Sequence, residues 1–115
     1  MKKTEIIKKN YEFKYFFKKG KFFSGKFLEV FIFDSNNIKN KLGIVVSKKV
    51  GGSVTRNHIK RYMREAYTSL EDKIESNINM LIIWNKNVDP KLATFFETKE
   101  DLTNILRKAG KIKGN

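Results

Sequence analysis

The arginines of this chain are concentrated in one short segment. Only four of its twenty-five Lys and Arg residues are arginine, and three of those four, Arg56, Arg61 and Arg64, fall close together. Lysine carries the same charge, so the use of arginine at these positions indicates a role for its planar guanidinium group. That group forms bidentate hydrogen bonds with phosphate or stacks on bases. The chemistry that this segment predicts is recognition of a phosphate-bearing polymer.

The same segment has the pattern of an amphipathic helix from about Val54 to Leu70. The side predicted to pack comprises Ile59, Tyr62, Met63, Ala66 and Leu70. The adjoining arc comprises Arg56, Asn57, Lys60, Arg61 and Arg64. Solvated helix faces usually mix charges of both signs, whereas this arc has no acid before Glu65. The pattern therefore favours a binding face over a face that is only solvated.

Small residues precede this helix. Gly51 and Gly52 allow the main chain to approach an RNA backbone closely, and the start of the helix adds exposed N–H donors. Lys48 and Lys49 lie immediately before them. We expect a loop here that contributes to the same binding face.

Other patterns predict the elements that position this face. A helix is expected over residues 10–19, capped by Asn10 and closed by Gly20, with Phe13, Phe16 and Phe17 on one side. Strands are expected at Phe27–Phe33, Leu42–Ser47 and Met80–Trp84. The spacing from Thr94 to Glu97 predicts a capping box before a last helix that carries Leu102, Ile105 and Leu106.

The first of these strands has two unlike faces. Leu28, Val30 and Ile32 point one way, and the other side comprises Phe27, Glu29, Phe31 and Phe33. Burial preferences alone favour a strand covered on both sides. The alternative is that bases stack on these rings, because every base presents a π-face. Phe16, Phe22 and Phe23 are assigned to the core.

The net charge is far larger than solubility requires. The 115 residues carry a formal charge of +13, and residues 1–70 hold seventeen Lys or Arg against five Asp or Glu. Apolar residues that must fold are interleaved with these charges, so the basic surface belongs to the domain and not to a tail. We expect one domain over residues 1–115 with a polyanionic partner.

Absences in the sequence narrow the class of protein further. The chain has no Cys, which excludes disulfides and thiolate metal sites. No apolar run approaches the roughly 18 residues of a membrane span, and the lysine-rich start lacks the apolar stretch of a signal peptide. A cytoplasmic protein without membrane association is expected.

The segment from Gly51 to Glu65 resembles the Arg-Asn-Arg box of the bacterial ribonuclease P protein family. The likeness extends upstream through Leu42–Lys49 and back to Lys8–Phe13, so it covers about residues 6–70. It implies an α+β fold, a single-domain α/β sandwich ordered αβββαβα. It also implies a left-handed βαβ crossover, contrary to the usual hand, as in the second domain of a small-subunit ribosomal protein.

The resemblance also implies partners and residue roles. The family's protein is the non-catalytic subunit of an endoribonuclease that removes the 5′ leader of precursor tRNA, so the partners are ribonuclease P RNA and precursor tRNA, with no obligate protein partner. Contacts with the catalytic RNA would come from Lys48, Lys49, Arg56, Asn57, Lys60, Arg61 and Arg64. The leader would lie in a cleft lined by Phe13, Phe17 and Phe31. His58 departs from the family, which commonly has a second arginine there.

The residues argue against catalysis by the protein itself. His58 is the only histidine, which excludes a paired-histidine mechanism of acid-base transfer, and the carboxylates form no two-metal pattern. No catalytic residue, metal or cofactor is therefore assigned to the protein. Magnesium is expected for the reaction that the RNA catalyses.

Three other functions fit parts of the pattern. A ribosomal or general RNA-chaperone protein shares the charge and size without needing the box spacing. A DNA-binding domain could place the same helix in a major groove and would prefer duplexes. A cationic membrane-surface helix fits least well, because flanking strands offer its apolar side a protein partner.

Overall fold

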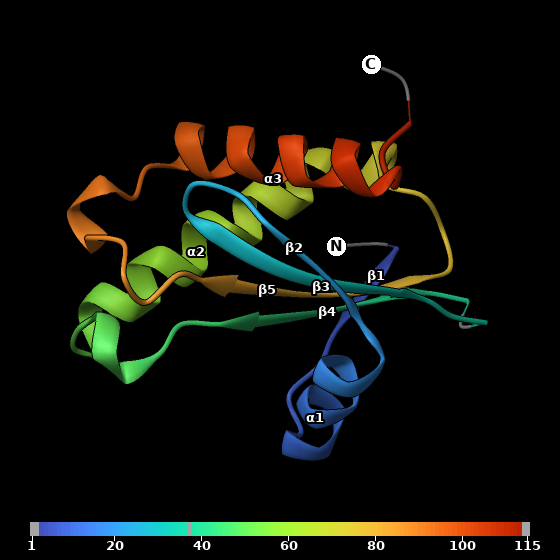
Figure 1. The fold of residues 1–115 in the computed structure, drawn as a ribbon, viewed down its shortest axis with the longest axis horizontal. Coiled ribbons are helices and arrows are strands. Elements are labelled where there is room, and N and C mark those ends of the chain that lie inside the picture. Colours follow the sequence, from blue (N-terminus) through green and yellow to red (C-terminus); the bar gives the residue numbers. More distant parts are fainter. Residues whose placement is uncertain (1–2, 37, 114–115) are drawn as a thin grey trace.

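One mixed five-stranded sheet organises the chain (Figure 1). The computed structural model describes residues 3–36 and 38–113. The strands are β1 (Thr4–Ile6), β2 (Lys21–Ser24), β3 (Leu28–Asp34), β4 (Asn40–Val45) and β5 (Ile78–Trp84). Their order in the sheet is β1-β4-β5-β3-β2, in which β4 pairs in parallel with β1 and β5, and β3 pairs antiparallel with β5 and β2.

Three helices pack on this sheet, α1 (Asn10–Lys19), α2 (Ser53–Leu70) and α3 (Phe95–Ala109). Figure 1 shows α1 on one side of the sheet, opposite α3. Because β4 and β5 are parallel neighbours, α2 is the crossover helix between them. The α/β sandwich and its predicted element order are confirmed, with the three-residue strand β1 added in front.

Of the two N-cap residues predicted from the sequence, one is confirmed and the other is wrong. Thr94 caps α3, since its side-chain oxygen accepts from the backbone N–H of Glu97 at 3.1 Å. The predicted cap at Asn10 is wrong, because Lys9 occupies the N-cap and makes no side-chain capping bond. Asn10 already has helical conformation, where its side chain cannot reach back over the first-turn donors.

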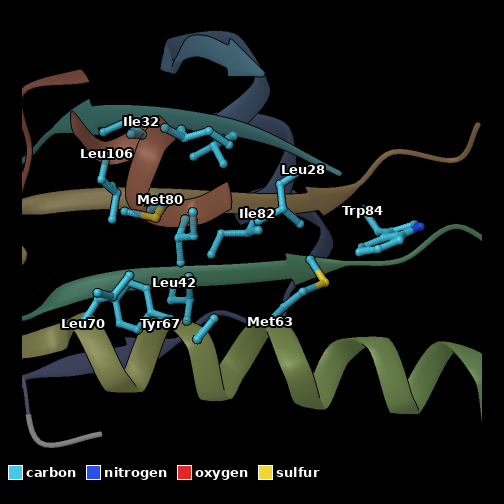
Figure 2. Close-up of a cluster of buried hydrophobic side chains, with 14 of the residues drawn as sticks. Leu28, Ile32, Leu42, Met63, Tyr67, Leu70, Met80, Ile82, Trp84 and Leu106 are labelled. Carbon is cyan, nitrogen blue, oxygen red and sulfur yellow. The ribbon is translucent and has the colours of Figure 1, made fainter. Parts of the chain in front are cut away.

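The main core lies between the sheet and helices α2 and α3 (Figure 2). Leu28, Val30 and Ile32 face this layer, as the alternation of β3 predicts. Tyr67 is fully buried here, whereas Tyr62, which we expected on the packing side, is only half-buried. The Tyr67 hydroxyl shares a 2.8 Å hydrogen bond with Thr4 Oγ1, so strand β1 satisfies the polar end of a buried ring.

A smaller cluster lies on the opposite face, under α1. It consists of Ile7, Phe16 and Leu81, with half-buried Phe13, Phe31 and Phe33 packed around them. Phe27 does not belong to this face, because it precedes β3 and stacks on Trp84 with ring centroids 5.7 Å apart. The alternation expected from position 27 therefore begins only at Leu28.

Asp101 on α3 fixes the hairpin between β2 and β3. Its carboxylate accepts three backbone N–H groups, those of Lys26, Phe27 and Leu28, at 2.8 to 3.0 Å. A side chain at Gly25 would collide with that carboxylate. The hairpin that carries the aromatic residues of β3 is therefore held to the opposite layer by charge-assisted hydrogen bonds.

Candidate nucleic-acid interface

The predicted basic loop lies where β4 runs into α2. After β4, a short 3-10 turn (Lys48–Val50) is closed by Ser47, whose Oγ accepts from the Lys49 N–H at 3.2 Å. Val50 is buried and anchors the turn, while Lys48 and Lys49 are exposed. This arrangement turns both lysine side chains outward beside the start of α2.

The start of α2 carries no side-chain cap. Gly52 occupies the N-cap position, and a Cβ added there would meet nothing within 4 Å. The first turn of α2 therefore has no side-chain acceptor from its N-cap, and there is room beside Gly52 for a ligand at a helix start, which favours anions. The sequence prediction of an accessible helix start is consistent with this geometry.

Arg56 is half-buried and makes a contact within the protein. Its Nε donates to the carbonyl oxygen of Gly51 at 3.2 Å, which ties the first turn of α2 to the preceding loop. Asn57 and Arg64 are exposed and Lys60 is half-buried. In the described part of the chain, the Lys60 and Arg64 side chains have no hydrogen-bond or ion-pair partner.

Arg61 is turned toward the other flank of α2. Its Nε lies 3.3 Å from Glu65 Oε1, and its guanidinium lies over the Tyr62 ring at 5.5 Å from the centroid. His58 packs edge-on against the same ring, with centroids 5.4 Å apart. Arg61 is therefore the one predicted arc residue that is paired with an acid. Among the described residues, no ion pair involves Arg56, Lys60 or Arg64.

The residues predicted to line an aromatic cleft lie on the α1 side of the sheet. Phe17 and Phe31 are in direct contact, with ring centroids 5.0 Å apart at 71°. Phe17 is 49% exposed, whereas Phe31 and Phe13 are half-buried in the smaller cluster. The structure therefore brings the three predicted cleft residues onto one surface, with Phe17 as its most accessible ring.

Phe22 belongs to this surface and was wrongly assigned to the core. It is 49% exposed, pairs with Phe31 in the β2–β3 register, and lies 5.1 Å from the Phe31 ring. The signal that could have found it is that register, since cross-strand partners point to the same face. The aromatic surface hereafter means Phe13, Phe17, Phe22 and Phe31.

Gly20 sets the distance between α1 and the aromatic strand. A Cβ at this position would lie 2.7 Å from both the Phe16 carbonyl oxygen and the Phe31 Cβ. Only glycine allows α1 to end directly against β3. That close approach is what places Phe17 against Phe31.

One row of the sheet separates the aromatic surface from the strand end that leads into the basic loop. Beyond Phe31, the next cross-strand row on this face consists of Glu29, Ile83 and Val45, all half-buried. Val45 ends β4, and the turn that carries Lys48 and Lys49 follows within three residues. A strand of nucleic acid lying across this face would reach rings and then lysines.

Residues 3–36 and 38–113 lack both a membrane-spanning helix and a cluster of metal ligands. None of the helices there is both long and apolar enough to cross a lipid bilayer. Nor do those residues contain a group of three or more His, Cys, Asp or Glu side chains placed to hold a metal ion.

Comparisons with known proteins point to one family. The family model described as Ribonuclease P matches residues 1–110. The ribonuclease P protein component of Clostridium kluyveri is 38% identical over 109 residues, covering 93% of this chain and 96% of that protein. That of a Bacillus cereus strain is 39% identical over 111 residues, covering 96% and 95%.

Solved structures show the same architecture. The RNase P protein of Thermotoga maritima aligns with a TM-score of 0.80 at 27% identity, covering 96% of this chain and 99% of that one. The Staphylococcus aureus RNase P protein aligns at 0.76 and 29%, covering 94% and 97%. Since sequence, family model and fold agree over nearly the whole length, this chain belongs to the ribonuclease P protein family.

Proposed function

We propose that this chain is the protein subunit of a ribonucleoprotein endoribonuclease that removes the 5′ leader of precursor tRNA. The observation that carries the proposal is that one row of the same sheet separates an aromatic surface from the strand end that leads into a basic loop. Membership of the ribonuclease P protein family supports it. The proposed place of action is the cytoplasm, with no obligate protein partner.

The basic loop and α2 bind the catalytic RNA in this proposal. The residues assigned to this contact are Lys48, Lys49, Arg56, Asn57, Lys60, Arg61 and Arg64. Exposed lysine and arginine side chains without internal partners can neutralise phosphates at little cost to the fold, and the uncapped start of α2 adds backbone donors. Arg61 would have to exchange Glu65 for phosphate, so its net contribution is smaller than that of Arg64.

The aromatic surface holds the single-stranded leader. Phe17 offers an exposed ring for stacking, and Phe31 supports it from the sheet, while Phe13 packs beneath them. Stacking tolerates any base, which a protein that accepts many leaders requires. Phe22 joins these three because it contacts Phe31 from the neighbouring strand.

The phosphodiester chemistry is assigned to magnesium held by the RNA, and no residue of this chain to catalysis. Its single histidine, His58, packs on Tyr62 at the flank of α2, away from the aromatic surface. The protein's contribution is then to bind substrate and to reduce the repulsion between two RNA backbones.

Binding to precursor and mature tRNA tests the proposal. The complex of this protein with a bacterial ribonuclease P RNA should bind leader-bearing tRNA more tightly than mature tRNA, and the RNA alone should discriminate less. Equal affinities with and without protein, despite a stable protein–RNA complex, would leave general RNA binding as the function.

A further inference from the structure

A pocket lies on the flank of α1 opposite to the aromatic surface. It has a volume of about 690 Å³ and opens between α1 and the end of β3, where Tyr11, Tyr15 and Phe33 line it. Phe16 points into the sheet between the two flanks, so Phe17 and Tyr15 lie on different sides of the helix. This pocket is not part of the proposed leader surface.

Aromatic rings form one wall of the pocket. Tyr11 and Tyr15 are one helical turn apart, 67% and 50% exposed. Tyr15 is braced edge-on by Phe33, with ring centroids 5.5 Å apart, and Phe33 is braced in turn by Phe16 at 5.0 Å. The pocket therefore has two accessible tyrosine rings, of which Tyr15 is held in place, as base stacking requires.

An unpaired amide lies at the base of the pocket. Asn79 on β5 is 5% exposed, and its Oδ1 has no hydrogen-bond partner in the described part of the chain. Buried polar atoms without partners are rare because they cost stability, so a ligand that bonds to this atom would gain affinity by removing that cost. A carboxamide offers a donor beside an acceptor, which is the pattern that the edge of a nucleobase presents.

The charges around the pocket favour an anionic ligand. Glu12 is paired with Lys41 at 3.6 Å, and Asp34 with Lys111 at 2.9 Å. Lys19, also in the lining, is exposed and has no ion-pair partner among residues 3–36 and 38–113. With both carboxylates neutralised, one lysine remains available for a phosphate.

We propose that this pocket binds one unpaired nucleotide of an RNA partner, with its base stacked on Tyr11 or Tyr15, its edge bonded to Asn79 and its phosphate near Lys19. The inference rests on the proposed RNA-binding function and adds a nucleotide site to it. The nucleotide could come from the leader or from the catalytic RNA, which share this chemistry.

Binding of adenosine 5′-monophosphate to the whole chain tests the pocket itself. In proton–nitrogen correlation spectra, the side-chain amide signal of Asn79 should shift during the titration. Tyr11→Ala combined with Tyr15→Ala should weaken this binding roughly tenfold through lost stacking. Phe96→Ala, which removes another exposed ring on α3, should leave it unchanged. No shift at Asn79, or shifts confined to the aromatic surface, would overturn the inference.

Since Tyr15 also packs on Phe33, Tyr11→Ala and Lys19→Ala are tested singly as well. Both side chains are exposed, so these variants keep the fold and should each weaken nucleotide binding. Unaltered binding in both would also count against the pocket.

The source of the nucleotide is identified by two measurements on the variant that combines Tyr11→Ala with Tyr15→Ala: its affinity for ribonuclease P RNA, and the affinity of the assembled complex for tRNA. Weaker assembly with ribonuclease P RNA assigns it to the catalytic RNA, and weaker binding of precursor but not mature tRNA assigns it to the leader. Affinities equal to those of Phe96→Ala in both assays overturn the inference, even where the wild-type protein discriminates precursor from mature tRNA. If the wild-type protein fails to discriminate while Asn79 still shifts, the proposed function fails and the pocket stands.

Discussion

The Nε of Arg56 donates to the carbonyl oxygen of Gly51 at 3.2 Å, so one arginine of the basic segment shapes the loop that the others flank. Loss of this side chain removes a contact within the protein together with the proposed phosphate contact. Arg64, which has no internal partner among the described residues, separates the two effects.

Arg64→Ala should weaken assembly with ribonuclease P RNA without changing stability. If Arg64 contacts a phosphate, the slope of log affinity against log salt should become shallower by about one. Binding is measured at several KCl concentrations, with Lys39→Ala as the control, because Lys39 is an exposed cation before the start of β4 and the basic loop follows the end of that strand. An unchanged slope in Arg64→Ala would remove this residue from the interface.

Glu65→Gln should strengthen RNA binding a few-fold at low salt. The substitution removes the carboxylate that lies 3.3 Å from Arg61 Nε and releases the guanidinium for phosphate. Asp72→Asn is the matched control, because it removes an exposed acid that pairs with Lys3 beyond the end of α2. Equal gains in both variants would mean that only net charge matters.

Phe17→Ala should reduce the preference for precursor over mature tRNA. Base stacking is worth about 1–3 kcal/mol, so a loss of roughly tenfold or more is expected in precursor affinity alone. Because Phe17 is 49% exposed, little stability should be lost. Phe96→Ala controls for removal of an exposed ring, and an equal effect on mature tRNA would contradict a leader contact.

Asp101→Ala should destabilise the fold by about 3 kcal/mol, because three backbone N–H groups lose a charged acceptor together. The free energy of unfolding is measured by urea titration. Glu100→Ala, an exposed acid one position earlier on α3, should cost far less. A similar loss in both variants would show that the hairpin does not depend on Asp101.

Stability at high pH should depend on Tyr67. Burial raises the pKa of Tyr67 above the ordinary 10.0, more than its hydrogen bonds to Thr4 and Asn40 lower it. Above pH 10 the unfolded chain loses this proton while the folded chain keeps it, so stability falls as pH rises toward the folded pKa. Tyr67→Phe should show a shallower fall above pH 10 than exposed Tyr11→Phe, and equal curves would contradict the assignment.

Long periodic patterns allowed much of the fold to be predicted. Helix α2 is 18 residues long, and its apolar residues recur at helical spacing on one side. The alternation of β3 predicts which of its side chains enter the core. Strand β1 has three residues, too few for a period to be recognised. The sequence did not show that Tyr67 would be more deeply buried than Tyr62, because burial depends on which elements pack against α2. Strand β1 is the element whose Thr4 hydrogen-bonds the Tyr67 hydroxyl.

The sequence predicted most of the residues that belong to the candidate site, but it did not predict the contacts that they make. Arg56 and Arg64 follow from spacing along one helix, whereas the turn of Arg61 toward Glu65 depends on side-chain conformation. The role of Phe22 depends on strand register, which the sequence did not fix. The tyrosine pocket joins residues of α1, β3, β4 and β5, so only the folded chain brings them together.

The most direct test of the central claim is cleavage of a precursor tRNA by a bacterial ribonuclease P RNA at near-physiological magnesium, with and without this protein. Cleavage at the mature 5′ end that appears only with the protein present is the predicted result. It should persist, more weakly, in Phe17→Ala. Binding to the RNA without any stimulation of cleavage would contradict the subunit role.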